Sequence, residues 1–218
     1  YKELIENTNK IANFLCEVTS KGDRIFVLMP NRIETLEILL ACLKVGRVYT
    51  PANFRLSSDE IAFLVNDAKP KVLIYDEEFE DKVDEIRDKI GDVSLIKVGK
   101  DFQELKEYNS SEPDVVTSPD DLAMILFTAG TTGRPKGVMH THRSLFFSSI
   151  ANHLAAGLSS SDVYFGAPPL FHAGGITCFQ LTTLMVGGTI VLQRRWDAKK
   201  ALEMIKDHGV TFFFGIAT

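Results

Sequence analysis

The sequence has few cysteines, and their positions exclude the usual sites built from cysteine. Its 218 residues include three, Cys16, Cys42 and Cys178, which lie far apart and form no CxxC pair. An odd, scattered set disfavours both a disulfide framework and a structural zinc site. We therefore expect a protein of a reducing compartment, and the cytoplasm as its location.

Long apolar runs and an excess of positive charge are also missing. No run approaches the roughly 20 residues of a membrane-spanning helix, and residues 1–15 are too polar for the apolar part of a secretory signal. The 24 Lys and Arg against 29 Asp and Glu give a net charge of −5, which argues against a general nucleic-acid binder. We expect no integral membrane span and no nucleic-acid partner.

The residues that are present predict an α/β fold. Hydrophobic residues make up 45% of the chain and charged residues 24%, the composition of a globular domain. Short β-branched runs alternate with helical patterns, beginning with a strand at 24–30, a helix at 33–45 and a strand at 71–75. This alternation is typical of mostly parallel sheets flanked by helices. Ser57 followed by Glu60 predicts a helix start with a capping box.

The pattern divides into two α/β subdomains, of which the second is incomplete. The first spans about 22–158, and pieces of the second are about 1–20 and 162–218. The second includes an apolar helix over 176–185 and a helix capped by Asp197. Because the chain opens inside a helical pattern and ends on an apolar strand, we expect it to be part of a longer protein.

The most informative segment follows the apolar strand 122–127. It reads Thr-Ala-Gly-Thr-Thr-Gly-Arg-Pro-Lys-Gly over 128–137, with a helix expected from about Arg143. Glycines let the backbone turn tightly and bring several amides to one oxyanion, the threonines add hydroxyls, and Lys136 adds a positive charge. This combination suits a polyphosphate better than an ordinary strand-to-helix turn.

Two common phosphate motifs do not fit this segment. The P-loop GxxxxGK[ST], counted from Gly130, would need a glycine where Pro135 stands and a hydroxyl where Gly137 stands. No GxGxxG occurs anywhere in the chain, so a Rossmann dinucleotide site has no support. Another kind of nucleotide chemistry is indicated.

The segment FTAGTTGRPKGV resembles the phosphate-loop signature of the adenylate-forming (AMP-binding) superfamily. GDRIFVLMPNRIE and PLFHAGGI follow that family's order and spacing, so the resemblance covers essentially the whole chain as an N-terminal fragment. The stretch 51–74 and the pair Phe171-His172 look most like an acyl-CoA synthetase, or fatty-acid–CoA ligase. Ala129 departs from the pattern, since the family usually has Ser, Thr or Gly there, but its amide remains a donor.

The resemblance implies a fold, a reaction and a site. The fold is the large N-terminal AMP-binding domain with two α/β subdomains, and the C-terminal domain lies outside this chain. The reaction joins a carboxylic acid, first of all a fatty acid, to ATP as an acyl-adenylate, and then to coenzyme A as a thioester, with Mg²⁺ as the metal. His172 would line the boundary between acid and nucleotide, and Thr128 would meet the metal. The implied nucleotide-binding residues are Thr128, Ala129, Gly130, Thr131, Thr132, Gly133 and Lys136, with Lys136 and His172 as the catalytic pair.

Alternatives stay open beside this interpretation. The chain could be a non-catalytic nucleotide-binding module, or the acid could be an aryl or amino acid; the fragment alone is expected to be inactive. A lone histidine such as His172 is by default a hydrogen-bonded core side chain, and the pair His140 and His142 lacks the further ligands of a metal site. The aromatic groups Phe146-Phe147 and 212–214 are expected in the core.

Overall fold

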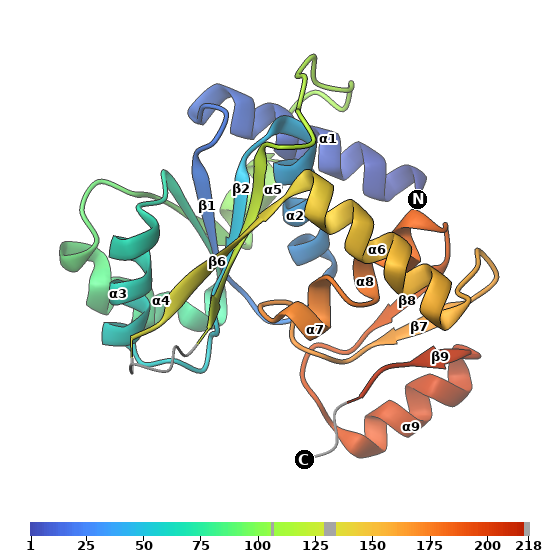
Figure 1. The fold of residues 1–218 in the computed structure, drawn as a ribbon. Coiled ribbons are helices and arrows are strands. Elements are labelled where there is room, and N and C mark those ends of the chain that lie inside the picture. Colours follow the sequence, from blue (N-terminus) through green and yellow to red (C-terminus); the bar gives the residue numbers. More distant parts are fainter. Residues whose placement is uncertain (106, 129–133, 216–218) are drawn as a thin grey trace. The chain divides into compact units, whose positions relative to one another are not determined.

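The structure is a computed structural model that describes residues 1–105, 107–128 and 134–215. These residues divide into two compact units (Figure 1). The first comprises Tyr1–Met29 and Glu34–His142, and the second comprises Pro30–Ile33 and Arg143–Thr218. The first helix therefore belongs to the first unit, whereas the sequence pattern had grouped 1–20 with the second subdomain.

The first unit contains a six-stranded sheet in the order β4-β3-β1-β2-β5-β6. Neighbouring strands are parallel except for β6, which runs antiparallel to β5. Every residue of β3 and four of the five in β1 are buried, as expected for parallel strands covered on both faces. The strands are β1 (Arg24–Leu28), β2 (Val48–Pro51), β3 (Val72–Asp76), β4 (Ser94–Val98), β5 (Leu122–Thr128) and β6 (Lys136–Thr141).

Helices connect these parallel strands and cover the sheet. In the sheet, β2 lies on one side of β1, whereas β3 and β4 lie on the other side, so the chain reverses direction after β2. Right-handed crossovers therefore put α2 on one face of the sheet and α3 and α4 together on the other face (Figure 1). The helical elements are α1 (Lys2–Val18), α2 (Ile33–Val45), α3 (Ser58–Ala68), η1 (Glu77–Phe79), α4 (Glu80–Ile86), η2 (Arg87–Lys89) and α5 (Lys100–Leu105).

Both ends of α3 are fixed by side chains. The Ser57 hydroxyl accepts a hydrogen bond from the Glu60 amide at 3.3 Å, and the Ser57 amide donates to the Glu60 carboxylate at 2.8 Å. The predicted capping box is thereby confirmed. At the other end Lys69 takes a left-handed conformation with φ of 49°, and Arg24 donates to the carbonyls of Ala68 and Lys69.

The second unit contains a three-stranded parallel sheet in the order β8-β7-β9. Phe165, Ala167, Val191 and Ala201 form its buried apolar cluster. Asp197 caps the last helix by accepting from the Lys200 amide at 3.0 Å, as the sequence predicted. The elements are α6 (His142–Ala156), β7 (Val163–Gly166), α7 (Ala173–Ile176), α8 (Gln180–Met185), β8 (Thr189–Leu192), α9 (Ala198–Asp207) and β9 (Phe212–Phe213).

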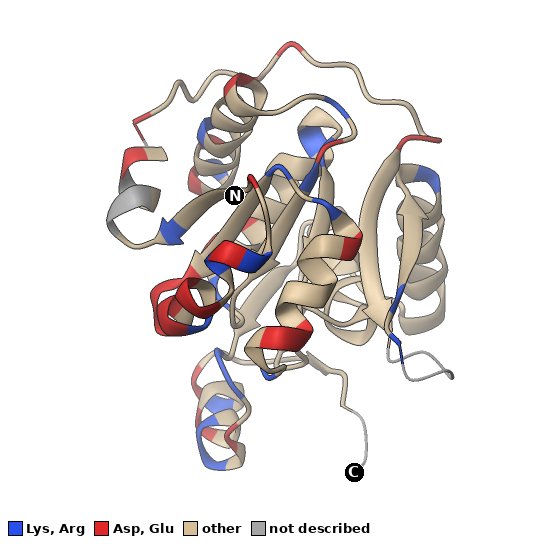
Figure 2. Cartoon of the chain, turned by 90° about the vertical axis from the view of Figure 1, so that its left-hand side faces the viewer, with Lys and Arg blue, Asp and Glu red and all other residues tan. Residues whose placement is uncertain are grey.

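Further sequence expectations differ from the structure. The helix expected over 176–185 is broken into α7 and α8, and strand β6 stands where only a short connection to the next helix was expected. Phe146 and Phe147, expected in the core, lie on α6 with 55% and 59% of their surfaces exposed. Figure 2 shows that α6 carries almost no charge. Both apolar and polar residues of this helix are exposed.

Two further observations concern the chain as a whole. Within residues 1–105, 107–128 and 134–215, no helix is long and apolar enough to cross a membrane. The three cysteines are free thiols, and burial raises the pKa of Cys42 far above its usual range.

Candidate functional site

The phosphate-loop segment joins the two strands of an antiparallel hairpin. Thr128 is the last residue of β5, Lys136 is the first of β6, and the two are direct partners in the strand register. Directly opposed residues of an antiparallel pair project from the same face of the sheet. The structure therefore places Thr128 and Lys136 opposite each other on one face of the hairpin, and both residues are exposed. The predicted loop residues Ala129, Gly130, Thr131, Thr132 and Gly133 lie outside the described residues.

The hairpin is anchored in the core of the first unit. Ala123, Met124 and Leu126 of β5 are buried, and Met124 pairs with Tyr49 of β2 in parallel register. Thr128 thus lies at the carboxyl end of a strand in a mostly parallel sheet, where ligands of α/β proteins usually bind. A rigid strand holds one end of the loop, which is what precise positioning of a ligand requires.

Gly137 has a packing role. A Cβ on this residue would lie 2.8 Å from the Cγ2 atom of Ile125 and 3.5 Å from the ring of Phe127. The sequence interpretation had grouped Gly137 with the glycines that approach an oxyanion. In the structure it is a residue of β6 that leaves room for two side chains of the neighbouring strand.

The charge of the hairpin end is positive. Between Phe127 and Gly137 the charged residues are Arg134 and Lys136, with no carboxylate. Both cations are exposed, and Figure 2 shows basic ribbon at this end of the hairpin. Cations without a neighbouring acid in the segment favour an anionic ligand over a cationic one.

His172 lies in the second unit, in the turn that follows β7. It is exposed and precedes α7 in an extended conformation. Its amide donates to the Pro169 carbonyl at 3.1 Å, and its carbonyl accepts from the Gly175 amide at 2.9 Å and the Ile176 amide at 3.1 Å. The backbone of His172 is therefore held by hydrogen bonds, and the residue is exposed in this unit.

Gly175 is part of the same turn for a steric reason. A Cβ here would lie 2.0 Å from the Pro169 carbonyl oxygen, a distance that no side chain tolerates. The glycine lets the first turn of α7 close onto the carbonyl that also receives the His172 amide.

Asn31 is a buried polar residue that the sequence interpretation did not single out. Its side chain is 4% exposed and donates to the carbonyls of Ala167, Pro168 and Gln193. Its carbonyl oxygen accepts from the Leu170 amide at 2.8 Å. The sequence offers little signal for this, since an asparagine after Met-Pro at a strand end looks like an ordinary turn residue.

The pair His140 and His142 belongs to β6 and the start of α6. Partial burial lowers the pKa of both imidazoles, and for His142 the nearby Asp121 carboxylate opposes that shift. In the part of the chain that the structure describes, no group of three or more His, Cys, Asp or Glu side chains is placed to hold a metal ion.

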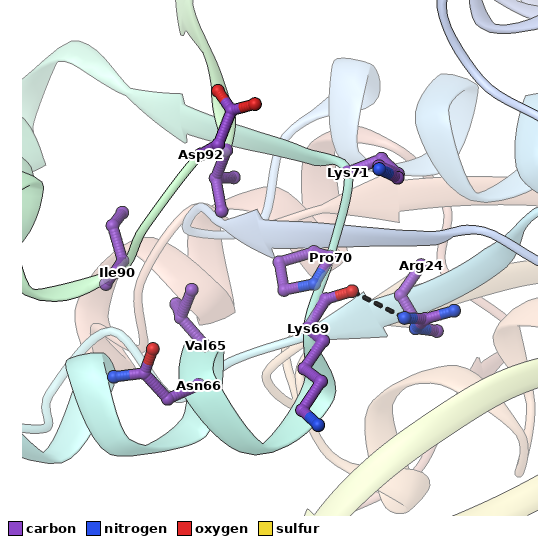
Figure 3. A pocket seen from close by; sticks show the side chains of 9 residues that line it. Arg24, Val65, Asn66, Lys69, Pro70, Lys71, Ile90 and Asp92 are labelled. Carbon is purple, nitrogen blue, oxygen red and sulfur yellow. Dashed lines mark hydrogen bonds between the residues drawn. The ribbon is translucent and has the colours of Figure 1, made fainter.

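A hollow of about 280 Å³ lies beside the end of α3 in the first unit (Figure 3). Arg24 begins β1 and Lys71 directly precedes β3, so this hollow is at the amino ends of the strands, away from Thr128. Arg24 uses its guanidinium there to bind the Ala68 and Lys69 carbonyls. We assign this hollow to the end of α3 and not to a nucleotide.

Relatives of this chain are carboxylate–CoA ligases. It is 33% identical to a feruloyl-CoA synthase of Amycolatopsis over all of its length and 43% of that protein, and 32% identical to a 2-succinylbenzoate–CoA ligase of Geobacillus over 97% of its length and 41% of that protein. It is 30% identical to the long-chain-fatty-acid–CoA ligase FadD13 of Mycobacterium tuberculosis over 96% of its length and 42% of that protein. The chain spans less than half the length of these relatives.

Solved structures and a family model agree with these relatives. The inhibitor-bound N-terminal domain of FACL13 from Mycobacterium tuberculosis superposes with a TM-score of 0.91 at 31% identity, over 98% of this chain and 55% of that one. ATP-bound MatB from Rhodopseudomonas palustris gives a TM-score of 0.86 at 28% identity, over 94% of this chain and 42% of that one. The model of the AMP-binding enzyme family matches residues 1–218. The chain belongs to the AMP-binding enzyme family.

Proposed function

We propose that the full-length protein activates a carboxylic acid with ATP and passes the acyl group to coenzyme A. The observation that carries this proposal is the hairpin end, where Thr128 and Lys136 are paired across β5 and β6 beside a glycine- and threonine-rich loop without carboxylates. Family membership and the CoA ligases among the relatives support it. The similarity to ATP-bound MatB supports ATP as the nucleotide.

The proposed reaction needs hydrogen-bond donors and cations at the phosphates of ATP. The acid oxygen attacks the α-phosphorus, and the bond to the departing pyrophosphate breaks as the acyl-adenylate forms. The thiol sulfur then attacks the acyl carbon and loses its proton to solvent, and AMP leaves with the electron pair of the carbon–oxygen bond. Attack by an anion on a polyanion is limited by repulsion, so fixed donors and cations at the phosphates carry the catalysis, without a covalent protein nucleophile.

Lys136 and Thr128 have distinct roles in this proposal. Lys136 places its ammonium on the β- and γ-phosphates, which leave as negatively charged pyrophosphate. The Thr128 hydroxyl would supply one oxygen for Mg²⁺, which suits an ion that keeps several waters and takes few protein ligands in phosphate sites. The bound metal would neutralise phosphate charge. By the resemblance of the sequence, residues 129–133 would supply the remaining amides and hydroxyls for the phosphates.

We further propose that His172 lines the boundary between the acid and the nucleotide. An exposed imidazole on a fixed backbone can donate to a carboxylate oxygen and hold it in line for attack. For the acid itself we propose a fatty acid, on the relationship to FadD13, with an aryl acid as the alternative that the feruloyl-CoA synthase supports. We also infer a cytoplasmic location, on the free thiols.

The test is an exchange assay on the full-length gene product. Fatty, aryl and amino acids are offered singly, and acid-dependent exchange of labelled pyrophosphate into ATP is measured for wild type, Lys136→Ala and Lys199→Ala. We expect a fatty acid to support exchange, and Lys136→Ala to lower it by about 10²-fold, the usual loss when one stabilising donor is removed. Lys199 lies exposed on α9 and serves as the matched control. We expect Lys199→Ala to leave the exchange rate unchanged.

The alternative is a nucleotide-binding module without catalysis. It would bind ATP in a titration while no acid of the panel supports exchange. Equal exchange by Lys136→Ala and wild type would instead remove Lys136 from the proposed site.

A further inference from the structure

We propose that Asn31 is a positioning residue for His172, and this inference rests on the role proposed for His172 above. Asn31 belongs to the short segment Pro30–Ile33, which is part of the second unit although it follows β1 in the sequence. Its side chain is 4% exposed and has four backbone partners in that unit.

The orientation of the Asn31 amide is dictated by its partners. The nitrogen faces three carbonyl oxygens, of Ala167 at 3.3 Å, Pro168 at 3.0 Å and Gln193 at 3.2 Å. The oxygen faces the amide of Leu170 at 2.8 Å. A flipped amide would put oxygen against three oxygens and nitrogen against a donor, so only one orientation is compatible with these neighbours.

Three of these partners lie in the segment that leads to His172. This segment, residues 167–172, connects β7 to α7 and is orange in Figure 1. It contains Pro168 and Pro169, which have no amide hydrogen and cannot join a strand ladder. Buried carbonyls need a donor from elsewhere, and Asn31 provides it for Ala167 and Pro168.

The fourth partner extends the restraint to the neighbouring strand. Gln193 directly follows β8, and its amide donates to the Gly166 carbonyl at the end of β7. Asn31 therefore holds the ends of both β7 and β8, with His172 six residues beyond Gly166. Beyond Leu170, which is 2% exposed, the turn is closed by the bond from the His172 amide to Pro169.

This geometry gives Asn31 an effect on catalysis without contact with the substrate. If the 167–172 segment shifts, His172 moves with it, and a misplacement of about 1 Å in a catalytic group lowers a rate by about 10²-fold. Asn31→Asp is the sharpest perturbation, because it keeps the acceptor for Leu170 and places a second carboxylate oxygen against three carbonyl oxygens. Asn31→Ala removes all four bonds without adding charge.

The experiment is a double-mutant cycle on the full-length protein with its best acid. Pyrophosphate exchange is measured for Asn31→Asp alone, His172→Ala alone and both together, with kcat and the KM for ATP determined separately. Asn9→Asp is the matched control, because Asn9 is 5% exposed and donates to the Ser110 carbonyl in the first unit. Circular dichroism gives the folded fraction, and rates are expressed per folded enzyme.

We expect Asn31→Asp to lower kcat by about tenfold or more with little change in the KM for ATP, and Asn9→Asp to leave kcat unchanged. In the His172→Ala background the further loss should be less than about twofold, since a residue that acts through His172 has nothing left to position. If Asn31→Asp does not fold, Asn31→Ala takes its place in the same cycle.

The possible negative results separate the role of Asn31, the role of His172 and the proposed function. An equal loss in both backgrounds, or an unchanged kcat for Asn31→Asp, overturns the positioning role while acid activation stands. An unchanged His172→Ala overturns the role of His172, and with it this inference. A wild-type protein that supports no exchange with any acid overturns the proposed function itself.

Discussion

At the scale of single residues, Gly175 offers the clearest steric prediction. Its absent Cβ would lie 2.0 Å from the oxygen and 2.6 Å from the carbon of the Pro169 carbonyl, which are backbone atoms that cannot rotate away. Gly175→Ala must therefore displace the turn that carries His172. We expect the free energy of unfolding to fall by about 1–3 kcal/mol, the usual cost of overpacking, measured by denaturant unfolding of the full-length protein.

The neighbouring glycine gives the control for this prediction. A Cβ on Gly174 would meet its nearest atom, in the Phe214 ring, at 3.5 Å, an ordinary contact. Gly174→Ala should therefore leave the unfolding midpoint nearly unchanged or raise it slightly, because alanine favours helix over glycine. Equal losses for the two variants would show that the contact with Pro169 is not the cause.

Residues also mark the limit of what the sequence could predict. The glycines and threonines of 128–133 carry a chemical pattern within ten positions, so a phosphate site could be inferred from sequence alone. Asn31 and the backbone groups that its side chain binds are separated by 136 to 162 positions, and no local pattern joins them. The packing role of Gly137 could not be predicted from sequence, because the need to leave space for Ile125 exists only once β5 and β6 are paired.

At the scale of elements, α3 shows how much a helix end contributes. Ser57 and Glu60 satisfy each other's amides at its first turn. Ser57→Ala removes the hydroxyl acceptor and should lower the free energy of unfolding by about 1 kcal/mol. Ser57→Thr keeps the hydroxyl and should retain most of that stability. Denaturant unfolding distinguishes the two variants, and a loss as large for threonine as for alanine would contradict the capping explanation.

The elements that sequence reasoning located share a physical feature. Parallel strands such as β1 and β3 are short, apolar and almost entirely buried, and the helix starts at Ser57 and Asp197 carry their own acceptors. Each of these features can be recognised from residues that are close in sequence. Strand β6 was missed because four of its residues are exposed and its pattern mixes Gly137 and His140 with apolar positions. The pairing of β6 with β5 cannot be recognised from the hydrophobic periodicity of the sequence alone.

At the scale of the whole molecule, acid should destabilise the fold in two stages. Burial holds the pKa of His140 and His142 below their ordinary value of 6.5. Hydrogen bonds from Lys21 and Ser118 hold the pKa of Asp121 below 3.8, and bonds from Thr211 and Ser159 do the same for Asp162. In every case the unfolded chain binds protons more readily than the folded one, so stability rises with pH.

The two stages fall in different pH ranges, and variants can separate them. A depressed histidine pKa gives stability that is complete above about pH 6.5 and is lost as pH falls from there through the folded value. The depressed aspartate pKa values give stability that is complete above about pH 3.8 and is lost below it. We expect the denaturant midpoint of the full-length protein, followed by circular dichroism, to fall between pH 7 and 5 by less in His140→Gln/His142→Gln than in wild type, while the loss below about pH 3.8 stays the same. An unchanged slope between pH 7 and 5 in that variant would assign the first stage to other groups.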